Sequence, residues 1–341
     1  MRQLRIGVVG AGHMGRLHAE KIAALRDEGE AVLVGGIVDL NRGRAEQLAS
    51  KVGTTGHTDI RALWSDEDPD PVFGTPRVDA VIVAVPTDSH YPVVSEALEA
   101  GLDVLVEKPI AANIAEASKL LALAEAGGRV LQVGHLEWFN SALESIRGRI
   151  DNPRFVEAHR MGPFSDRATD TDIVRDLMIH DLDILQRILG EEPEQIHAVG
   201  LPVLSPTLDI ANARLVYPSG CIANLTASRV SNTPQRKLRF FQRDGCVSVD
   251  FLAQSATVFR RLQLDGELPQ IEVEEVQVDR VDALLSQLRA FVRVVRNRER
   301  PKVDGLGGLD ALRTAVRVIG AMSPQAVMAP GNREPSTKRE P

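Results

Sequence analysis

The feature that most constrains the fold is a regular alternation of short apolar segments and amphipathic segments near the start of the chain. Strands are expected at Leu4–Gly10, Ala31–Asp39, Asp79–Val85, Asp103–Glu107 and Val130–Gly134, and helices at Met14–Leu25, Arg42–Lys51, Tyr91–Ala100 and Ile114–Ala126. Such alternation predicts a doubly wound parallel sheet with right-handed crossovers. The acidic, proline-rich segment Trp64–Arg77 is expected to be a surface excursion.

The second part of the chain has a different rhythm. Strand-like segments follow one another at Gln195–Val199, Ile210–Tyr217, Cys221–Ser228, Lys237–Gln242, Val247–Phe251, Ala256–Arg260 and Ile271–Gln277, with helical patterns at Thr171–Leu189, Val281–Asn297 and Leu309–Met322. We therefore predict an α/β protein: an N-terminal Rossmann domain (1–135) and a C-terminal α+β domain (136–328) with a large, mainly antiparallel open sheet. Residues 329–341 are polar and are expected to form a flexible tail.

A glycine motif lies between the first strand and the first helix. Its sequence, GAGHMG at Gly10–Gly15, matches G-x-G-x-x-G. The first glycine permits a tight turn, the second lets a pyrophosphate approach the backbone, and the third allows helix and strand to pack closely. The helix N-terminus adds amides and positive potential. The motif predicts dinucleotide binding by Gly10, Gly12, His13, Met14 and Gly15.

Asp39, at the end of the second predicted strand, bears on the choice of dinucleotide. A carboxylate there accepts hydrogen bonds from the adenosine ribose and repels a 2′-phosphate, which favours NAD over NADP. Arg42 and Arg44 follow closely, so some use of NADP stays open, and Arg42 is a candidate cofactor contact.

Two further segments follow predicted strands and are expected at the same sheet edge. Glu107-Lys108-Pro109 places a lysine where open α/β sheets bind ligands; it could bind a substrate oxygen, transfer a proton or simply cap the strand. Pro86, Thr87 and His90 of the other segment (PTDSH) would border the cofactor together with Glu107 and Lys108. The alternative for His90 is a solvent-facing position at a helix start.

A second set of reactive side chains lies in the predicted helix Thr171–Leu189. Asp176, His180 and Asp183 are spaced to share one helical face. A carboxylate one turn before a histidine can fix its tautomer and raise its basicity for acid–base catalysis. The alternatives are a structural pair and a metal site, but Asp176 and His180 supply only two ligands and no third is evident, so no metal is expected.

Composition excludes several classes of partner. The chain has 40 basic and 47 acidic residues, a net charge of −7, and only 4% aromatic residues, so neither nucleic acid nor an anionic membrane is expected as a partner. Cys221 and Cys246 cannot form a disulfide framework, and the N-terminal apolar segment is too short for a signal peptide. We expect a cytoplasmic protein that acts on a small molecule.

The chain resembles the Gfo/Idh/MocA oxidoreductases over about residues 4–325. The motifs that carry the resemblance are GAGHMG, Asp39, PTDSH, EKP at Glu107–Pro109 and DLMIH at Asp176–His180. The resemblance implies that Lys108, Asp176 and His180 meet beside the nicotinamide of NAD. It also implies oxidation or reduction of a secondary hydroxyl on a sugar or cyclitol, and a homodimer or homotetramer formed through the C-terminal sheet.

Within this family, segments such as Val133–Asn140 and Arg175–Asp183 are similar to the UDP-N-acetylglucosamine 3-dehydrogenases, which make a 3-keto sugar for transamination in lipid A synthesis. Trp138 and Ser141 depart from that subgroup, which has Arg and Pro there. A UDP-sugar requires local positive charge. Three residues are candidates for substrate binding beside Lys108, Asp176 and His180, each with a structural alternative: Asn140, Arg160 and Arg167.

The resulting hypothesis is oxidation of C3 of a UDP-N-acetylhexosamine. His180 is expected to be the general base, oriented by Asp176, with Lys108 stabilising negative charge on the oxygen. Exchanging the roles of Lys108 and His180 fits the sequence equally well. The competing functions are a dehydrogenase of a free sugar or inositol and a non-catalytic NAD-binding regulator.

Overall fold

A computed structural model describes residues 2–64, 78–164, 171–262 and 268–322. The chain divides into two compact units. Unit 1 combines Met1–Glu144 with Asp279–Leu312, and unit 2 combines Ser145–Val278 with the chain from Arg313 onward. The predicted surface excursion (except Trp64) and the predicted tail lie outside the described residues.

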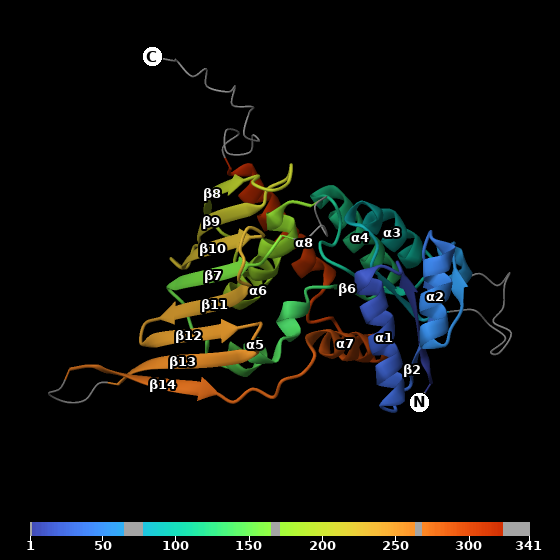
Figure 1. Ribbon diagram of the computed structural model, residues 1–341, viewed down its shortest axis with the longest axis horizontal. Coiled ribbons are helices and arrows are strands. Elements are labelled where there is room, and N and C mark those ends of the chain that lie inside the picture. Colours follow the sequence, from blue (N-terminus) through green and yellow to red (C-terminus); the bar gives the residue numbers. More distant parts are fainter. Residues whose placement is uncertain (1, 65–77, 165–170, 263–267, 323–341) are drawn as a thin grey trace, which may run out of the picture. The chain divides into compact units, whose positions relative to one another are not determined.

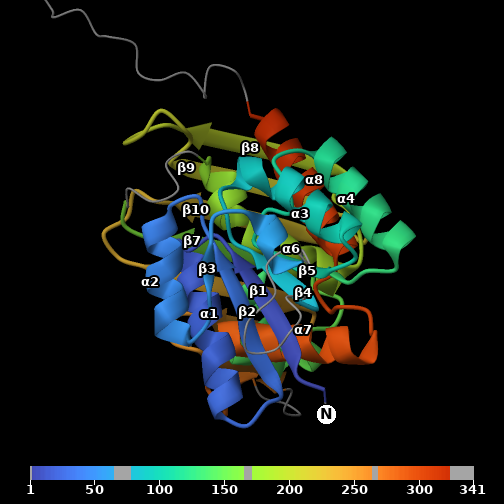
Figure 2. The same ribbon diagram turned by 90° about the vertical axis from the view of Figure 1, so that its right-hand side faces the viewer.

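Unit 1 is built on a parallel six-stranded sheet with the strand order β3-β2-β1-β4-β5-β6 (Figure 2). The strands are β1 (Leu4–Val9), β2 (Val32–Val38), β3 (Gly56–His57), β4 (Ala80–Val83), β5 (Asp103–Val106) and β6 (Leu131–Val133). All residues of β4 and β5 are buried, as expected of central strands that are covered on both faces. The predicted doubly wound sheet is confirmed. The two-residue β3 was not predicted, because it is too short to show a pattern.

Helices cover both faces of this sheet. The α-helices of unit 1 are α1 (His13–Asp27), α2 (Arg42–Val52), α3 (His90–Glu99), α4 (Ile114–Gly127) and α7 (Ala283–Asn297). Helices α1, α2 and α7 share one apolar core with the sheet, and α3 packs beside α4. Short 3₁₀ helices lie at η1 (Ile60–Leu63), η2 (Thr87–Ser89), η3 (Leu136–Phe139) and, in unit 2, η4 (Arg147–Arg149).

Helix α7 belongs to unit 1 although it comes near the end of the sequence. Its apolar face places Phe291 and Val292 in the core, at 0% and 1% exposure. Arg298, which caps its C-terminus in the left-handed conformation (φ 55°), donates to Asp103 at 2.5 Å and to Gly128 O at 2.6 Å. These contacts join α7 to the amino end of β5 and the end of α4.

Unit 2 is built on an eight-stranded sheet with the order β14-β13-β12-β11-β7-β10-β9-β8 (Figure 1). The strands are β7 (Phe155–Met161), β8 (Gln195–Leu201), β9 (Ile210–Val216), β10 (Ile222–Ser228), β11 (Gln235–Gln242), β12 (Gly245–Asp250), β13 (Ser255–Leu262) and β14 (Gln270–Val276). Among the strands that the structure describes in this sheet, β7 and β10 pair in parallel and all other neighbours pair antiparallel. The prediction of a large, mainly antiparallel sheet is confirmed.

Strand β7 lies in the middle of the sheet but was not predicted from the sequence. Its sequence FVEAHRM alternates in burial, with Val156, Ala158 and Arg160 on the buried face. Arg160 places a charge on the buried face of this strand. The strand therefore lacks the regular alternation of apolar side chains that identified the other strands.

The predicted helix Thr171–Leu189 consists of two parts in the structure. Residues Val174–Met178 form a π-helical turn (η5), and α6 continues over Ile179–Leu189 and ends at Gly190 in the left-handed conformation. The remaining helices are α5 (Ser141–Ile146) and α8 (Gly305–Gly320), each of which extends over residues of both units. Within the described parts of the chain, no helix is both long and apolar enough to cross a membrane.

Candidate active site

The glycine motif forms a turn that only glycine can make at two positions. Gly10 has φ 95°, and a Cβ there would lie 2.5 Å from Ala84 O; a Cβ at Gly15 would lie 1.7 Å from Gly10 O. A Cβ at Gly12 would meet nothing within 4 Å. Gly12 is also the N-cap of α1 and leaves this helix start without a side-chain cap. The loop therefore has a compact inner side and an open outer side, and it fits the diphosphate of a dinucleotide.

Asp39 follows β2 and is hydrogen-bonded to the glycine loop. Its Oδ2 accepts from Ala11 N at 2.8 Å, and its Oδ1 accepts from Asn41 N at 2.8 Å. The guanidinium of Arg44 lies 3.2 Å from Oδ1, so this carboxylate carries a positive neighbour. The geometry fits recognition of an adenosine ribose. It also places a cation where a 2′-phosphate would need one, so both dinucleotides remain compatible with the site.

The other predicted cofactor contacts on these loops are exposed to different degrees. His13 and Pro86 are exposed, while Met14 and Thr87 are partly buried. Arg42 is exposed and lies 3.6 Å from Glu46, one turn further along α2.

Lys108 lies just beyond β5, partly buried between two buried neighbours, Glu107 and Pro109. Glu107 is turned inward rather than toward a cofactor, because its Oε1 lies 2.7 Å from the Nε2 of the fully buried His18. Burial by itself would raise the pKa of Glu107. The hydrogen bond and the electrostatic interaction with His18, together with the positive charge of Lys108, outweigh that effect and hold the pKa below its usual value. Glu107 therefore has an internal carboxylate, and its predicted contact with a cofactor would have to come from its backbone.

His90 is also turned inward, with 1% of its surface exposed. Its Nδ1 lies 2.8 Å from Pro109 O, and its Nε2 lies 3.0 Å from Val85 O. Burial lowers the pKa of His90 and favours the neutral ring. Both ring nitrogens face backbone carbonyls, so the solvent-facing alternative for His90 is excluded, and the predicted contact of this segment with a cofactor would involve its backbone.

In unit 2, Asp176 lies in the π-helical turn and His180 is the second residue of α6; both side chains are partly exposed. The wider turn keeps residues four apart on one side of the helix, and π-helical turns are frequent at functional sites. Asp183, predicted on the same stripe, is instead buried and bonded to Arg187 at 2.8 Å. Lys108 belongs to unit 1, so the three predicted catalytic residues come from both units.

The predicted substrate contact Arg160 requires a correction. It lies on the inner face of β7 with a side-chain exposure of 2%, and its Nη2 and Nε donate to Asp181 at 2.8 and 3.1 Å. Because the guanidinium is buried and paired with Asp181, it does not face solvent. Asn140 is likewise buried, and its Oδ1 accepts from Ala142 N at the start of α5. Arg167 lies outside the described residues.

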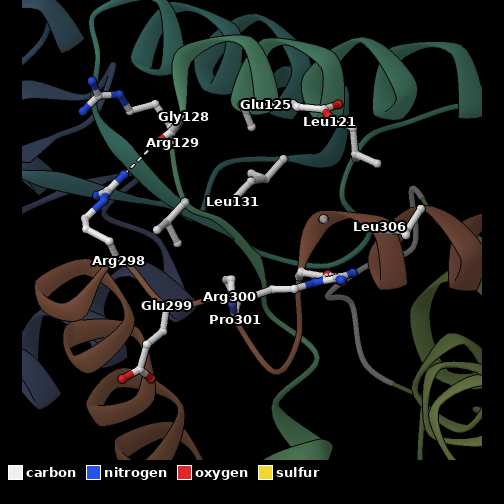
Figure 3. Close-up of a pocket in the computed structure, with 14 residues that line it drawn as sticks. Leu121, Glu125, Gly128, Arg129, Leu131, Arg298, Glu299, Arg300, Pro301 and Leu306 are labelled. Carbon is white, nitrogen blue, oxygen red and sulfur yellow. Dashed lines mark hydrogen bonds and ion pairs between the residues drawn. The ribbon is translucent and has the colours of Figure 1, made fainter.

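A cavity of about 660 Å³ opens elsewhere in unit 1, beside the end of α4 and the segment between α7 and α8 (Figure 3). It contains Arg129, Arg298 and Arg300. Arg300 is bonded to Asp304, Arg129 to Gly127 O, and Arg298 to Gly128 O and Asp103. These contacts occupy the three arginines with the protein itself. Across the described residues, no group of three or more His, Cys, Asp or Glu side chains could hold a metal ion.

Two residues that support the site, His18 and Asp181, were not predicted from the sequence. His18 belongs to the buried stripe of α1, with Gly15, Ala19 and Ile22, and a histidine in an apolar stripe was the available signal. Asp181 directly follows His180, but nothing local in the sequence indicates that its partner is Arg160, 21 residues earlier.

Two family models match the chain. The first, described as the oxidoreductase family with an NAD-binding Rossmann fold, covers residues 4–135, and the second, the GFO/IDH/MocA C-terminal domain, covers residues 142–248. UDP-N-acetylglucosamine 3-dehydrogenase of Acidithiobacillus ferrooxidans is 33% identical over 93% of this chain and 97% of its own length. A solved structure of that enzyme has a TM-score of 0.85 and covers 94% of this chain and 98% of its own. Myo-inositol 2-dehydrogenase of Thermotoga maritima is 26% identical over 91% of this chain and 93% of its own length.

Proposed function

Since the chain belongs to the Gfo/Idh/MocA family of NAD-binding oxidoreductases, we propose that it oxidises C3 of UDP-N-acetylglucosamine to the 3-keto sugar. The observation that carries the proposal is the common placement of the glycine loop and Lys108. The loop follows β1 and Lys108 follows β5, and β4 lies between these two strands. Two interstrand spacings place β1 and β5 about 10 Å apart. That separation is shorter than an extended dinucleotide. The similarity to the A. ferrooxidans enzyme supports the choice of sugar.

In this proposal, the reacting hydroxyl loses its proton to His180 while its carbon loses a hydride. Asp176 orients His180, and Lys108 stabilises the negative charge that develops on the oxygen. Bound NAD supplies the hydride acceptor. Asp39 favours NAD over NADP by repelling a 2′-phosphate, although Arg44 weakens this discrimination. The alternative assignment makes Lys108 the general base. The pH dependence of turnover in variants of Lys108 and His180 would distinguish the two assignments.

The second candidate is oxidation of a free sugar or inositol, and the position of Arg160 favours it. One of the two arginines expected to meet a substrate diphosphate is buried against Asp181, and an uncharged polyol needs no such contact. The T. maritima relative is named as an inositol dehydrogenase. Trp138 and Ser141 also differ from the subgroup of UDP-sugar enzymes.

The deciding experiment incubates purified protein with NAD or NADP and a panel of UDP-sugars, free hexoses and inositols. Reduced nicotinamide is followed by absorbance, with a ketone trap to draw the reaction forward. We expect reduction with UDP-N-acetylglucosamine and NAD. Reduction only with free polyols would establish the second candidate, and reduction with no compound would support a non-catalytic NAD-binding regulator.

We also propose the setting in which the enzyme works. A 3-keto sugar is a substrate for transamination, so the product would supply 3-amino sugars for lipid A or surface polysaccharide. Cys221 and Cys246 are buried free thiols, which supports a reducing cytoplasm. Half-exposed apolar side chains such as Val199 and Leu201 on the sheet of unit 2 support a homodimer or homotetramer.

A further inference from the structure

Two buried histidines contact the residues on either side of Lys108. His18 reaches Glu107 from α1, and His90 reaches Pro109 from the start of α3. Neither ring faces solvent, and the proposed reaction assigns no role to either. Both contacts lie within unit 1.

The contact with His18 fixes the residue before Lys108. The carboxylate of Glu107 accepts from His18 Nε2 at 2.7 Å and from the backbone N of Lys108 at 3.3 Å. A Cβ at Gly134 would come within 2.9 Å of Oε2, so the glycine leaves room for this carboxylate. The Nδ1 of His18 is buried and has no partner among the described residues.

The contact with His90 fixes the residue after Lys108. Its Nδ1 and Nε2 lie between Pro109 O and Val85 O, which belong to the loops after β5 and β4. A neutral ring carries one N–H and donates to one of these carbonyls at a time. In either tautomer the ring fills the space between the two loops.

We propose that His18 and His90 are positioning residues that hold the backbone on both sides of Lys108 and so fix where its ammonium group points. This proposal rests on the proposed catalytic role of Lys108. It also connects Lys108 to the cofactor loops. His18 lies one turn beyond Gly15 on the helix that the glycine loop begins, and His90 begins the helix that follows the Pro86–Ser89 segment. A side chain placed wrongly by about 1 Å can lose about 10²-fold in rate.

The first test does not depend on the substrate. Lysines are reductively methylated with ¹³C-formaldehyde, and the Lys108 signal is assigned in NMR spectra by its loss in K108R. We expect His18→Ala and His90→Ala to shift or broaden this signal. His18→Gln restores a donor to Glu107 and should return the signal to its wild-type position. His57→Ala is the matched control, since His57 is a partly exposed histidine of unit 1 that bonds Thr55. Should His18→Ala fail to fold, Glu107→Gln removes the charge of the acceptor and should shift the same signal.

The second test uses turnover of the substrate found in the panel. We expect the alanine variants to lose up to about 10²-fold in kcat with a KM for NAD within about threefold of wild type, and His18→Gln to recover most of kcat. A loss confined to the KM for NAD, or a Lys108 signal unchanged in both alanine variants, would overturn the proposal. If the wild type oxidises no compound, the proposed function fails, while the NMR result still decides the positioning role.

Discussion

At the residue scale, the two reactive side chains of the proposed mechanism each stand beside a buried carboxylate. Lys108 follows Glu107, which is held by His18, and His180 precedes Asp181, which is held by Arg160. In both cases the neighbour is fixed in the interior while the reactive side chain stays partly exposed. This arrangement anchors the backbone next to the reactive group without burying the group itself.

Replacing the reactive side chains should abolish most turnover and spare cofactor binding. We expect Lys108→Ala and His180→Ala each to lower kcat by about 10²–10⁴-fold, the usual value of a positioned acid, base or charge. The affinity for NAD, measured by calorimetry without substrate, should change little in either variant. Lys119→Ala, on the outer side of α4, serves as the control and should keep wild-type turnover. Wild-type rates in both site variants would rule out the assigned roles.

At the element scale, an internal ion pair joins the sheet of unit 2 to the helix that carries His180. Arg160 of β7 and Asp181 of α6 have side-chain exposures of 2% and 4%, and Arg160 also lies over the ring of Phe251, 5.4 Å from its centroid. The pair fixes the start of α6, and thereby His180, against the middle of the sheet.

Removing one partner of this pair should be costly. Arg160→Ala leaves Asp181 buried without its cation, and we expect a loss of about 3–5 kcal/mol in the free energy of unfolding, measured with urea. Arg261→Ala removes a partner from an exposed pair of unit 2, with side-chain exposures of 52% and 64%, and should cost about 0–1 kcal/mol. The double variant Arg160→Met/Asp181→Leu should regain most of the lost stability. Equal losses in Arg160→Ala and Arg261→Ala would contradict this account.

The buried carboxylate of Asp209 should make the free energy of unfolding depend on pH. Asp209 accepts from the backbone N of Val203, Leu204 and Ser205 and pairs with Arg229. Burial raises its pKa, but the hydrogen bond from the Ser205 hydroxyl (2.7 Å) and those from the three backbone N–H groups outweigh that effect and lower the pKa below its usual value. A depressed folded-state pKa stabilises the protein fully above about pH 3.8, and this contribution is lost as pH falls through the folded-state value.

The measurement compares urea unfolding of wild type and Asp209→Asn between pH 7 and pH 3. The variant should be less stable at pH 7 and should lose less stability on acidification, so the two curves approach each other below pH 3.8. Parallel curves over this range would show that Asp209 does not carry the effect.

The elements that could be predicted from the sequence are those with a strong local pattern. The strands β1, β2, β4, β5 and β6 are short apolar runs between amphipathic helices, and the glycine motif marked the first crossover. Strand β7 could not be predicted this way, since Arg160 occupies a buried position and its partner Asp181 is distant in sequence. The π-helical turn at Val174–Met178 has no signal in spacing, because residues four apart stay on one side in either kind of helix.

The part of the candidate site that could be predicted consists of residues of a suitable type placed directly after a strand. The glycine loop, Asp39 and Lys108 all lie at the carboxyl ends of strands, as the motifs indicated. The orientations of Glu107, His90 and Arg160 were not predictable. A polar side chain next to a motif can point outward to a ligand or inward to a partner, and the inward partners here come from other elements of the fold.

At the scale of the whole molecule, the eight-stranded sheet of unit 2 carries both polar and apolar side chains on one of its faces. Polar pairs such as Asn212 with Thr226 and Arg239 with Glu157 cross its middle. On β8, Val199 and Leu201 project from the same face and are each 48% exposed. A sheet face with both apolar and paired polar side chains is suited to contact with a second copy.

We therefore expect sedimentation velocity to give the mass of a dimer or tetramer. Val199→Glu with Leu201→Glu should shift the distribution toward the monomer, because burying two carboxylates in an apolar contact is unfavourable. Leu306→Glu, at a similarly exposed leucine of unit 1 (47%), is the control and should leave the mass unchanged. A monomeric wild type would exclude the assembly.

The late position of α7 in the sequence has a consequence for biosynthesis. Domains usually fold in order as they leave the ribosome, the N-terminal one first. Here the core of unit 1 lacks Leu288, Phe291 and Val295 until α7 has left the ribosome, and strands β7 to β14 leave it before α7 does. Synthesis of unit 1 therefore begins first, but unit 1 cannot finish folding until the strands of unit 2 have been synthesised. A nascent chain stopped after residue 144 would expose an apolar sheet face and depend on chaperones.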